Sequence, residues 1–419
     1  MENTSDGQAY MKAPEVLTYL GIRHQTLYAY VSRGAIRSFR QPGTKSNLYL
    51  REDVERTRER AEARSGRGAI AASAMQYGEP IVPTSITEIS AEGPRYRGRA
   101  AVELARQNTP FESVAELLWT GLLPDDDVHW EAGTLPPAVS RLCASLGKTV
   151  TPEQFMEVFG LVTLTLGISR GDVNRRRRSG NTLEAARQML QVLVGCMGFV
   201  SRERKFVAIR RGDSVVQGVL RSLGGEVNAE NMRAVEAILI LLADHELAPG
   251  SFSARVAASS GASLHGCLVA AMCTHAGLRV SRVYNRAEEF LGSGRTRAAL
   301  LKQLGELRHL GREIPGFTHR LYPKGDPRAV YLLGLAAARS QRSVRLREFL
   351  AFVAAAQQEF GLHPTVELAA VALCNEMGLP RESGGAMFAV ARSAGWVAHV
   401  MEQRLSSVML RPRAKFVTT

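Results

Sequence analysis

Long apolar runs are missing from this sequence of 419 residues. The longest, near residues 235–243, is interrupted by Glu236 and followed by Asp244, whereas a membrane-spanning helix needs about 18 or more apolar residues in succession. The first residues form neither a basic nor an apolar segment, so they do not resemble a secretory signal. We therefore expect a cytoplasmic protein without a membrane span.

Cysteine is also scarce, and the residues that occur are scattered, odd in number and form no CxxC pair. They are Cys143, Cys196, Cys267, Cys273 and Cys374. Such spacing suits neither a zinc site nor a disulfide framework. We expect buried or free thiols in a reducing compartment and no bound metal.

Positive charge is present in excess, with 53 basic and 40 acidic side chains and a net charge of +13. An acidic partner is implied, and both nucleic acid and anionic metabolites, such as dicarboxylates or CoA phosphates, fit that description. The excess is spread along the chain, because residues 1–68 hold only twelve basic and eight acidic side chains. A hydrophobic fraction of 45% excludes a disordered chain, and the length indicates two or three domains.

Two regions of the chain differ in composition and in hydrophobic periodicity. Residues 1–63 hold short helical segments and a turn-rich stretch, whereas residues 78–419 are rich in Ala, Leu and Val with helical periodicity. The segment between them, 64–77, begins with the linker-like sequence Arg-Ser-Gly-Arg-Gly. Strand signals in the second region are few, and the one at 79–86 is short and interrupted by prolines. The sequence predicts a small N-terminal domain, a linker and an all-α large domain.

The N-terminal region contains a pair of short helices followed by a hairpin pattern. The first helix is predicted from Pro14 to Leu20 with Gly21 as its stop, and the second from His24 to Arg33. Alternating apolar residues at 36–50 predict a β-hairpin. The stretches APEVLTYLGIRHQTLYAYVSRGAI and LYLREDVER resemble the winged helix-turn-helix of the MerR/excisionase type. Residue 23 is Arg, where that family usually has an N-capping Ser or Thr.

That resemblance implies a DNA-binding surface on the second helix and the wing. The expected base readers and phosphate contacts are Arg23, Gln25, Thr26, Tyr28, Arg33, Arg37, Arg40 and Lys45. A protein-interaction or oligomerisation domain that has lost DNA binding remains the alternative, because a local net charge of +4 is modest for a reader of phosphates.

Four segments of the large domain carry histidines and arginines and stand out from the apolar helical pattern around them. They are DHEL at 244–247, IPGFTHRLY at 314–322 with DPR at 326–328, AVAR at 389–392, and LRPR at 410–413. Arginine forks bind carboxylates in a bidentate manner, and a histidine can polarise a carbonyl. The combination indicates a site for a small anion with two or three carboxylates.

These segments, in this order and spacing, resemble citrate synthase over residues 78–416. The resemblance implies an all-α subunit with a large and a small lobe, the small one at about 260–365. It also implies a dimer, a CoA thioester as substrate and no further cofactor. The oxaloacetate-binding residues of that family correspond here to His245, His319, Arg328, Arg392 and, reaching in from the other subunit, Arg411.

Three positions depart from the family pattern. The Asn expected three residues after His245 is Ala248, and a gapless count puts Val280 where the family has the histidine that hydrogen-bonds the thioester enolate. His275 could take that role only if the preceding helix were shorter by more than one turn. The catalytic base, usually Asp, is Glu367 here. We therefore expect His319 and Glu367 to be catalytic and the activity to be weak or altered.

Two hypotheses follow from these residues. The first is a citrate-synthase-type acyltransferase of the tricarboxylic acid cycle that joins an acyl-CoA to oxaloacetate or a similar 2-oxo acid, as a homodimer or together with a second citrate-synthase-like chain. The second is a non-catalytic regulator that senses a di- or tricarboxylate and binds DNA.

Overall fold

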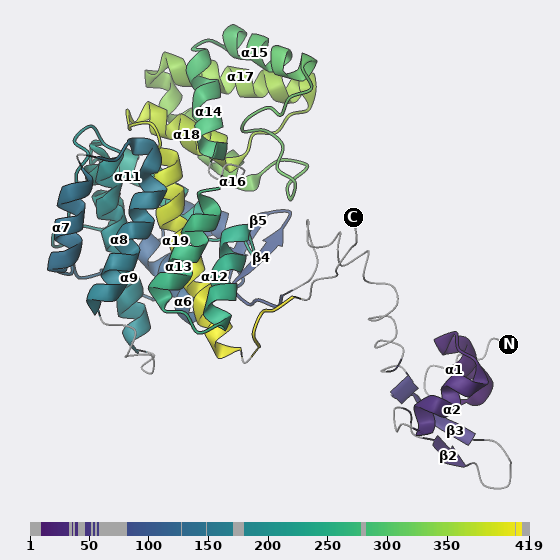
Figure 1. Cartoon of the computed structure of the whole chain (residues 1–419). Coiled ribbons are helices and arrows are strands. Elements are labelled where there is room, and N and C mark those ends of the chain that lie inside the picture. Colours follow the sequence, from purple (N-terminus) through teal and green to yellow (C-terminus); the bar gives the residue numbers. More distant parts are fainter. Residues whose placement is uncertain are drawn as a thin grey trace. The chain divides into compact units, whose positions relative to one another are not determined.

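The computed structural model describes residues 10–32, 36, 38–40, 47–51, 53–54, 57, 82–126, 128–147, 149–170, 180–277, 282–406 and 408–412. The chain forms two compact units, Met1–Pro83 with Arg413–Thr419, and Thr84–Pro412 (Figure 1). All five cysteines are free thiols, as expected. Within the described ranges, no helix is both long and apolar enough to cross a bilayer.

The first unit holds two helices and one antiparallel sheet. Its elements are β1 (Tyr10–Lys12), α1 (Ala13–Leu20), α2 (His24–Ser32), β2 (Ser38–Arg40) and β3 (Asn47–Leu50), with strand order β1-β3-β2. Gly21 ends α1 in the left-handed conformation at φ 63°, which confirms the predicted stop. Phe39 pairs with Leu48, so the predicted hairpin is also confirmed, whereas its turn lies outside the described residues. The strand β1 was not expected.

The second unit begins with a small sheet that the sequence did not predict. Its antiparallel strands are β4 (Thr87–Ser90), β5 (Gly93–Tyr96) and β6 (Arg99–Ala100). The expectation of an all-α domain is therefore corrected to a mostly helical one. The prolines at 80 and 83 precede the strands rather than interrupt them. The hydroxyl of Tyr96 donates to the carbonyl of Ile240, which attaches this sheet to the end of α11.

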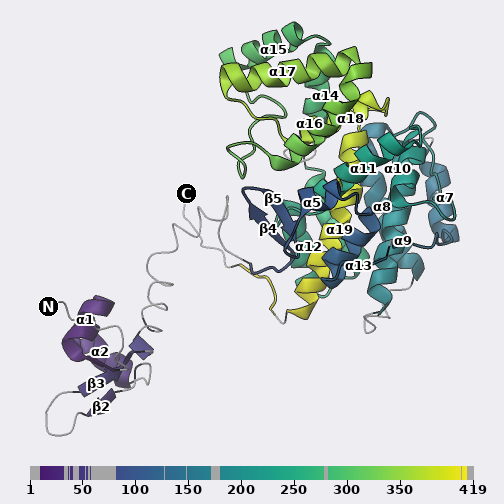
Figure 2. The same cartoon turned by 180° about the vertical axis from the view of Figure 1, so that it is seen from behind.

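Helices make up the rest of the second unit (Figures 1 and 2). They are α5 (Ala101–Arg106), α6 (Phe111–Thr120), α7 (Pro137–Leu146), α8 (Phe155–Arg170), α9 (Gly180–Cys196), α10 (Val215–Leu223), α11 (Ala229–Leu242), α12 (Pro249–Ser259), α13 (Leu264–His275), α14 (Arg282–Ser293), α15 (Arg297–His309), α16 (Pro327–Arg339), α17 (Val344–Phe360), α18 (Val366–Glu376) and α19 (Ser383–Leu405). Short 3-10 turns lie at Pro152–Gln154, Met197–Phe199 and Ser340–Arg342.

The helices α14 to α18 pack against one another as one group, and Figure 1 shows α14, α15 and α17 of this group above the remaining helices. The helix α13 lies inside the range 260–365 expected for the small lobe, yet it packs against α8 and α12. It is apolar on most faces, so it is stable only when surrounded by other helices. The helix α18 extends beyond that range and packs against α14 and α16.

The helix α19 is buried along most of its length and contacts α6, α9, α11, α12 and α18. Trp396 in this helix is 1% exposed and belongs to the core. Because α19 touches both the α14–α18 group and the remaining helices, it connects the two parts of the site described next.

Candidate active site

His245 lies in the turn between α11 and α12, directly after a fully buried carboxylate. Asp244 lies 3.3 Å from Nε2 of His399, and both side chains are 0% exposed. Burial would raise the pKa of Asp244, but the charge and hydrogen bond of His399 hold it below its usual value. The next residue, Glu246, has φ 57°, a conformation that is costly for a residue with a side chain. The Asp244–His399 contact therefore fixes a strained turn that presents His245.

Ala248 is the N-cap of α12, and its side chain makes no capping hydrogen bond. An Asn at this position would cap the helix or reach the site. Having Ala248 instead of Asn therefore removes a polar group close to His245.

His319 lies in the long turn between α15 and α16, which is attached to the start of α18. The amide of Thr318 donates to the carbonyl of His363, and the amide of Thr365 donates to the carbonyl of Gly316. Gly316 has φ 79°, and a Cβ there would come within 2.7 Å of Leu368. Only glycine allows the turn to approach α18 this closely.

The hydrogen bonds of His319 fix its tautomer. The amide of Leu321 donates to Nδ1 of His319 at 3.2 Å, so the proton of the neutral ring is on Nε2. The rings of His245 and His319 are 5.4 Å apart and nearly perpendicular. Nε2 of His245 lies 3.0 Å from the hydroxyl of Tyr322, a residue that was not predicted to belong to the site.

Arg328 is 2% exposed and is held by a bidentate contact with Asp326. Nε and Nη2 of Arg328 donate to the two carboxylate oxygens at 3.0 and 2.9 Å. Asp326 also caps α16 and accepts a hydrogen bond from the amide of Val366 at the start of α18. Burial alone would lower the pKa of Arg328, but the Asp326 carboxylate raises it above its ordinary value. The guanidinium is thus charged and fixed, with N–H groups left for a ligand.

Arg392 enters the site from α19 and is 4% exposed. Its Nε donates to the carbonyl of Leu242 at the end of α11, and its guanidinium carbon lies 4.7 Å from the centre of the Phe388 ring. Burial lowers the pKa of Arg392. These contacts occupy one N–H and one face of the guanidinium, and the remaining donors are available.

Both histidines are neutral because they are buried beside these arginines. Burial first, and then the charges of Arg328 and Arg392, lower the pKa of His245 well below 6.5. Burial and Arg328 likewise lower the pKa of His319, and the carboxylate of Glu367 offsets this only in part. Glu367 lies in the first turn of α18. The structure therefore gathers five of the six predicted residues around one point.

Arg411 is the predicted site residue that this chain does not bring to the others. It is exposed beyond the end of α19, where the amide of the preceding residue, Leu410, donates to the hydroxyl of Ser259. Val280 lies outside the described residues. His275 is buried at the end of α13 and stacks on Phe388 with ring centres 4.4 Å apart.

The expected DNA contacts are described only in part. Gln25, Thr26 and Tyr28 are exposed on α2, and Arg23 is exposed just before it, while Leu27 is buried in the core of this unit. For the wing, the backbone of Arg40 lies in β2. Arg33, Arg37 and Lys45 lie outside the described residues.

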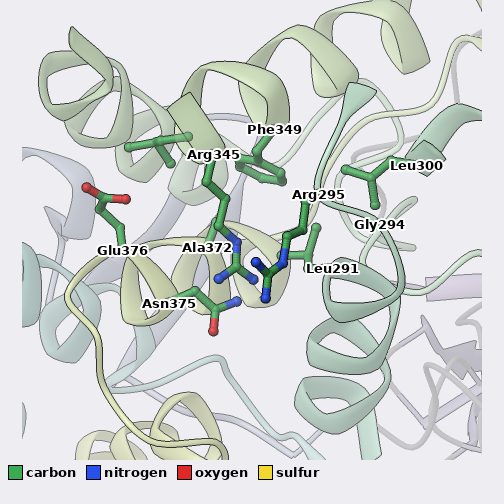
Figure 3. A pocket seen from close by; sticks show the side chains of 10 residues that line it. Leu291, Gly294, Arg295, Leu300, Arg345, Phe349, Ala372, Asn375 and Glu376 are labelled. Carbon is green, nitrogen blue, oxygen red and sulfur yellow. The ribbon is translucent and has the colours of Figure 1, made fainter. Parts of the chain in front are cut away.

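A separate cleft lies within the α14–α18 group, and none of the predicted site residues lines it (Figure 3). Figure 3 shows the guanidinium groups of Arg295 and Arg345 close to one another beside Asn375. Within the described ranges, no group of three or more His, Cys, Asp and Glu side chains could hold a metal ion.

Sequence reasoning assigned no role to Asp244, His399, Asp326 or Tyr322, although all four lie in or beside the segments it selected. Asp326 could have been recognised, because Asp before Pro is a common start of a helix. The Asp244–His399 contact joins residues 155 positions apart, and nothing in one sequence indicates that pairing.

Known proteins similar to this chain in sequence and in fold identify its family. A family profile described as the citrate synthase C-terminal domain matches residues 76–413. The citrate synthase of Haloferax volcanii is 27% identical over 77% of this chain and 88% of its own length, and a 2-methylcitrate synthase of Corynebacterium glutamicum is 26% identical over 77% and 88%. The citrate synthase of Thermoplasma acidophilum, solved with carboxymethyl coenzyme A and oxaloacetate, has the same fold with a TM-score of 0.73 at 20% identity, over 83% of this chain and 96% of that one. The chain belongs to the citrate synthase family.

Proposed function

We propose that this protein condenses an acyl-CoA, such as acetyl-CoA, with oxaloacetate or a similar 2-oxo acid. The observation that carries the proposal is the arrangement of two buried, charged arginines around two neutral histidines. Each arginine is held by a fixed partner and keeps donors for a carboxylate. A 2-oxo dicarboxylate has one carboxylate for each arginine and a carbonyl between them.

His319 has the chemistry to activate that carbonyl. Its Nε2–H is a neutral donor, because Nδ1 is already occupied by the amide of Leu321. A hydrogen bond from Nε2 stabilises the negative charge that develops on the carbonyl oxygen during attack. His245, whose ring lies 5.4 Å from that of His319, would contact the same ligand, and Tyr322 restrains its ring.

Glu367 is the base in this proposal. Its carboxylate removes a hydrogen from the carbon next to the thioester, and the resulting enolate carbon attacks the activated carbonyl carbon. The new alkoxide takes up a proton, which balances the one removed. Water then cleaves the C–S bond and releases the tricarboxylate and the free thiol. These steps need no cofactor besides the CoA substrate.

We expect the activity to be weak or altered. Valine at position 280 cannot donate a hydrogen bond, and loss of one such donor typically costs about 3–4 kcal/mol of barrier. The extra methylene of Glu367 displaces the base relative to an Asp, and an error of about 1 Å can cost 100-fold.

The active unit in this proposal is a homodimer. Arg411 is exposed beyond the end of α19, in keeping with a role in the site of a second copy. In a heterodimer, another citrate-synthase-like chain would contribute the arginine instead. It would also supply the hydrogen-bond donor that Val280 lacks.

The test is thiol release from acetyl-CoA and propionyl-CoA with and without oxaloacetate. The proposal predicts slow release that requires oxaloacetate and is lost in Glu367→Gln, which keeps the size of the side chain without its basicity. Thiol release that does not depend on oxaloacetate, or that persists in Glu367→Gln, would contradict the proposal.

A second candidate is a di- or tricarboxylate-sensing transcriptional regulator. It is favoured by the separate N-terminal unit, in which Gln25, Thr26 and Tyr28 are exposed on α2 and Arg23 is exposed just before it. Oxaloacetate would bind between the same arginines and alter the affinity of a dimer for a palindromic DNA site. DNA affinity that does not change when oxaloacetate or citrate is added would exclude this function.

A further inference from the structure

The hydroxyl of Tyr284 is a polar group that the proposed reaction has not used. Tyr284 lies in the first turn of α14 and is 2% exposed. Its oxygen is buried and has no hydrogen-bond partner among the described residues. A buried polar group of this kind is rare in folded proteins and calls for an explanation. A Ser or Thr hydroxyl in a helix can rotate towards a carbonyl of the preceding turn, but a phenol oxygen stands at the end of a rigid ring.

The ring of Tyr284 lies between the two helices that carry the base and an arginine of the site. A Cβ on Gly384, in the first turn of α19, would come within 3.1 Å of the ring and within 3.4 Å of Val371. Val371 is one helical turn after Glu367 on α18. The ring centre is also 5.6 Å from that of Phe388, which contacts the guanidinium of Arg392. The ring of Tyr284 therefore packs next to the helix that carries the proposed base and against the aromatic ring that contacts the ligand-binding arginine.

The position of Tyr284 is fixed by its neighbours on α14. Nδ2 of Asn285 donates to the carboxylate of Glu382 at 2.8 Å, and the amide of Glu382 donates to the carboxylate of Glu288 at 3.1 Å. Both contacts attach α14 to the turn before α19. A rigidly held donor costs little reorganisation when charge develops in front of it.

The charges of the site also reach this hydroxyl. Burial, followed by the negative charge of Glu367, raises the pKa of Tyr284 well above its ordinary value, and the positive charges of Arg392 and Arg328 oppose that rise. The phenol consequently keeps its proton at neutral pH and can act as a donor.

We infer that Tyr284 is a catalytic residue of the acyl half of the site, whose hydroxyl donates a hydrogen bond to the thioester carbonyl oxygen. This rests on the proposed condensation. When Glu367 removes the hydrogen from the α-carbon, the electron pair of that C–H bond forms a carbon–carbon double bond, and the carbonyl π pair moves onto oxygen. The hydrogen bond of Tyr284 stabilises the resulting oxyanion, and the phenol proton need not leave. Tyr284 thus supplies one hydrogen bond to the oxyanion, while position 280 with valine supplies none.

Tyr284→Phe removes only the hydroxyl, so it is the variant to test. The kcat for condensation should fall about 100-fold, as it does when one oxyanion donor is removed, with the KM for oxaloacetate unchanged. Exchange of the acyl α-hydrogens with deuterated water in the presence of oxaloacetate should fall by the same factor. Tyr331→Phe is the matched control, because the hydroxyl of Tyr331 donates to the carbonyl of Ala105 in the packing between α16 and α5. An equal loss in both variants, or none in Tyr284→Phe, would overturn the inference.

A binding measurement separates this inference from the proposed function. In protein labelled with 3-fluorotyrosine, the ¹⁹F signal of Tyr284 is the one that Tyr284→Phe lacks. That signal should shift when carboxymethyl-CoA is added to the oxaloacetate complex, even if the wild-type chain releases no thiol. No turnover together with a shift would refute the condensation and keep Tyr284 as a thioester ligand. An unchanged signal in the saturated complex would refute the role of Tyr284.

Discussion

Replacing Arg328 by alanine separates the stability of the site from its affinity for ligand. The guanidinium is 2% exposed, and the Asp326 carboxylate that it binds has a side-chain exposure of 0%. The variant therefore loses a ligand contact and also leaves a buried carboxylate without its counter-charge. Any comparison of variants has to measure both effects.

The single and double variants should differ measurably in their free energy of unfolding. Breaking a buried ion pair by removing one partner costs about 3–5 kcal/mol of stability. Removing Asp326 as well eliminates the isolated charge but also the N-cap of α16 and the hydrogen bond to the amide of Val366, each worth about 1 kcal/mol. The double variant Asp326→Ala/Arg328→Ala should therefore be more stable than Arg328→Ala by roughly 1–3 kcal/mol.

The assay is equilibrium unfolding of each variant with and without oxaloacetate. A ligand at 100 times its Kd adds about 2.7 kcal/mol to the wild type, and this gain should be absent from both the single and the double variant. Arg286→Ala is the control, because Arg286 is exposed and pairs with exposed Glu313 at 3.2 Å. Arg286→Ala should lower the free energy of unfolding by less than about 1 kcal/mol and should keep the full stabilisation by oxaloacetate. An oxaloacetate gain that survives in the double variant would mean that the ligand binds elsewhere.

Three further predictions concern the acyl half, the buried acids and the N-terminal unit. Val280→His should increase condensation, and adding Glu367→Asp should increase it further in a non-additive way, since donor and base act in one transition state; additive effects would show that they act separately. Burial, and then nearby Glu288, raise the pKa of Glu382 from 4.5 to about 7, so this carboxyl destabilises the fold as pH rises through that window. Glu382→Gln should accordingly add roughly 2–3 kcal/mol at pH 8 and little at pH 4, and equal gains at both would refute the assignment. Deleting residues 1–66 should leave a folded dimer that has lost any salt-sensitive DNA binding. Aggregation of the shortened chain would instead indicate that the N-terminal unit has a structural role.

Much of the site could be predicted because its residues lie in short, distinctive segments. His245, His319 and Arg328 are each adjacent to a turn or helix end with an unusual composition, whereas Arg392 lies in the middle of α19, and the structure brings all four together. Their ligand-binding role is implied by the resemblance, whereas their neutral or charged state follows from burial that only the fold reveals.

The remaining features depend on contacts between distant parts of the chain. The Asp244–His399 contact and the packing of Tyr284 against Gly384 join helices that no local pattern relates. The strands β4 to β6 were missed because they are two to four residues long and include Gly93 and Pro94, which have low strand propensity. The α1 stop at Gly21 was predicted correctly because a left-handed glycine after a helix is a local signal.

The central claim is that this site forms a carbon–carbon bond between a thioester and a 2-oxo acid. Its most direct test follows acetyl-CoA labelled with ¹³C in the acetyl group, mixed with oxaloacetate and the full-length protein, by NMR. The account predicts that the label moves into a methylene and a carboxylate of a tricarboxylate while an equal amount of free thiol appears. Label that remains in acetyl-CoA, or that is released as acetate, would contradict it.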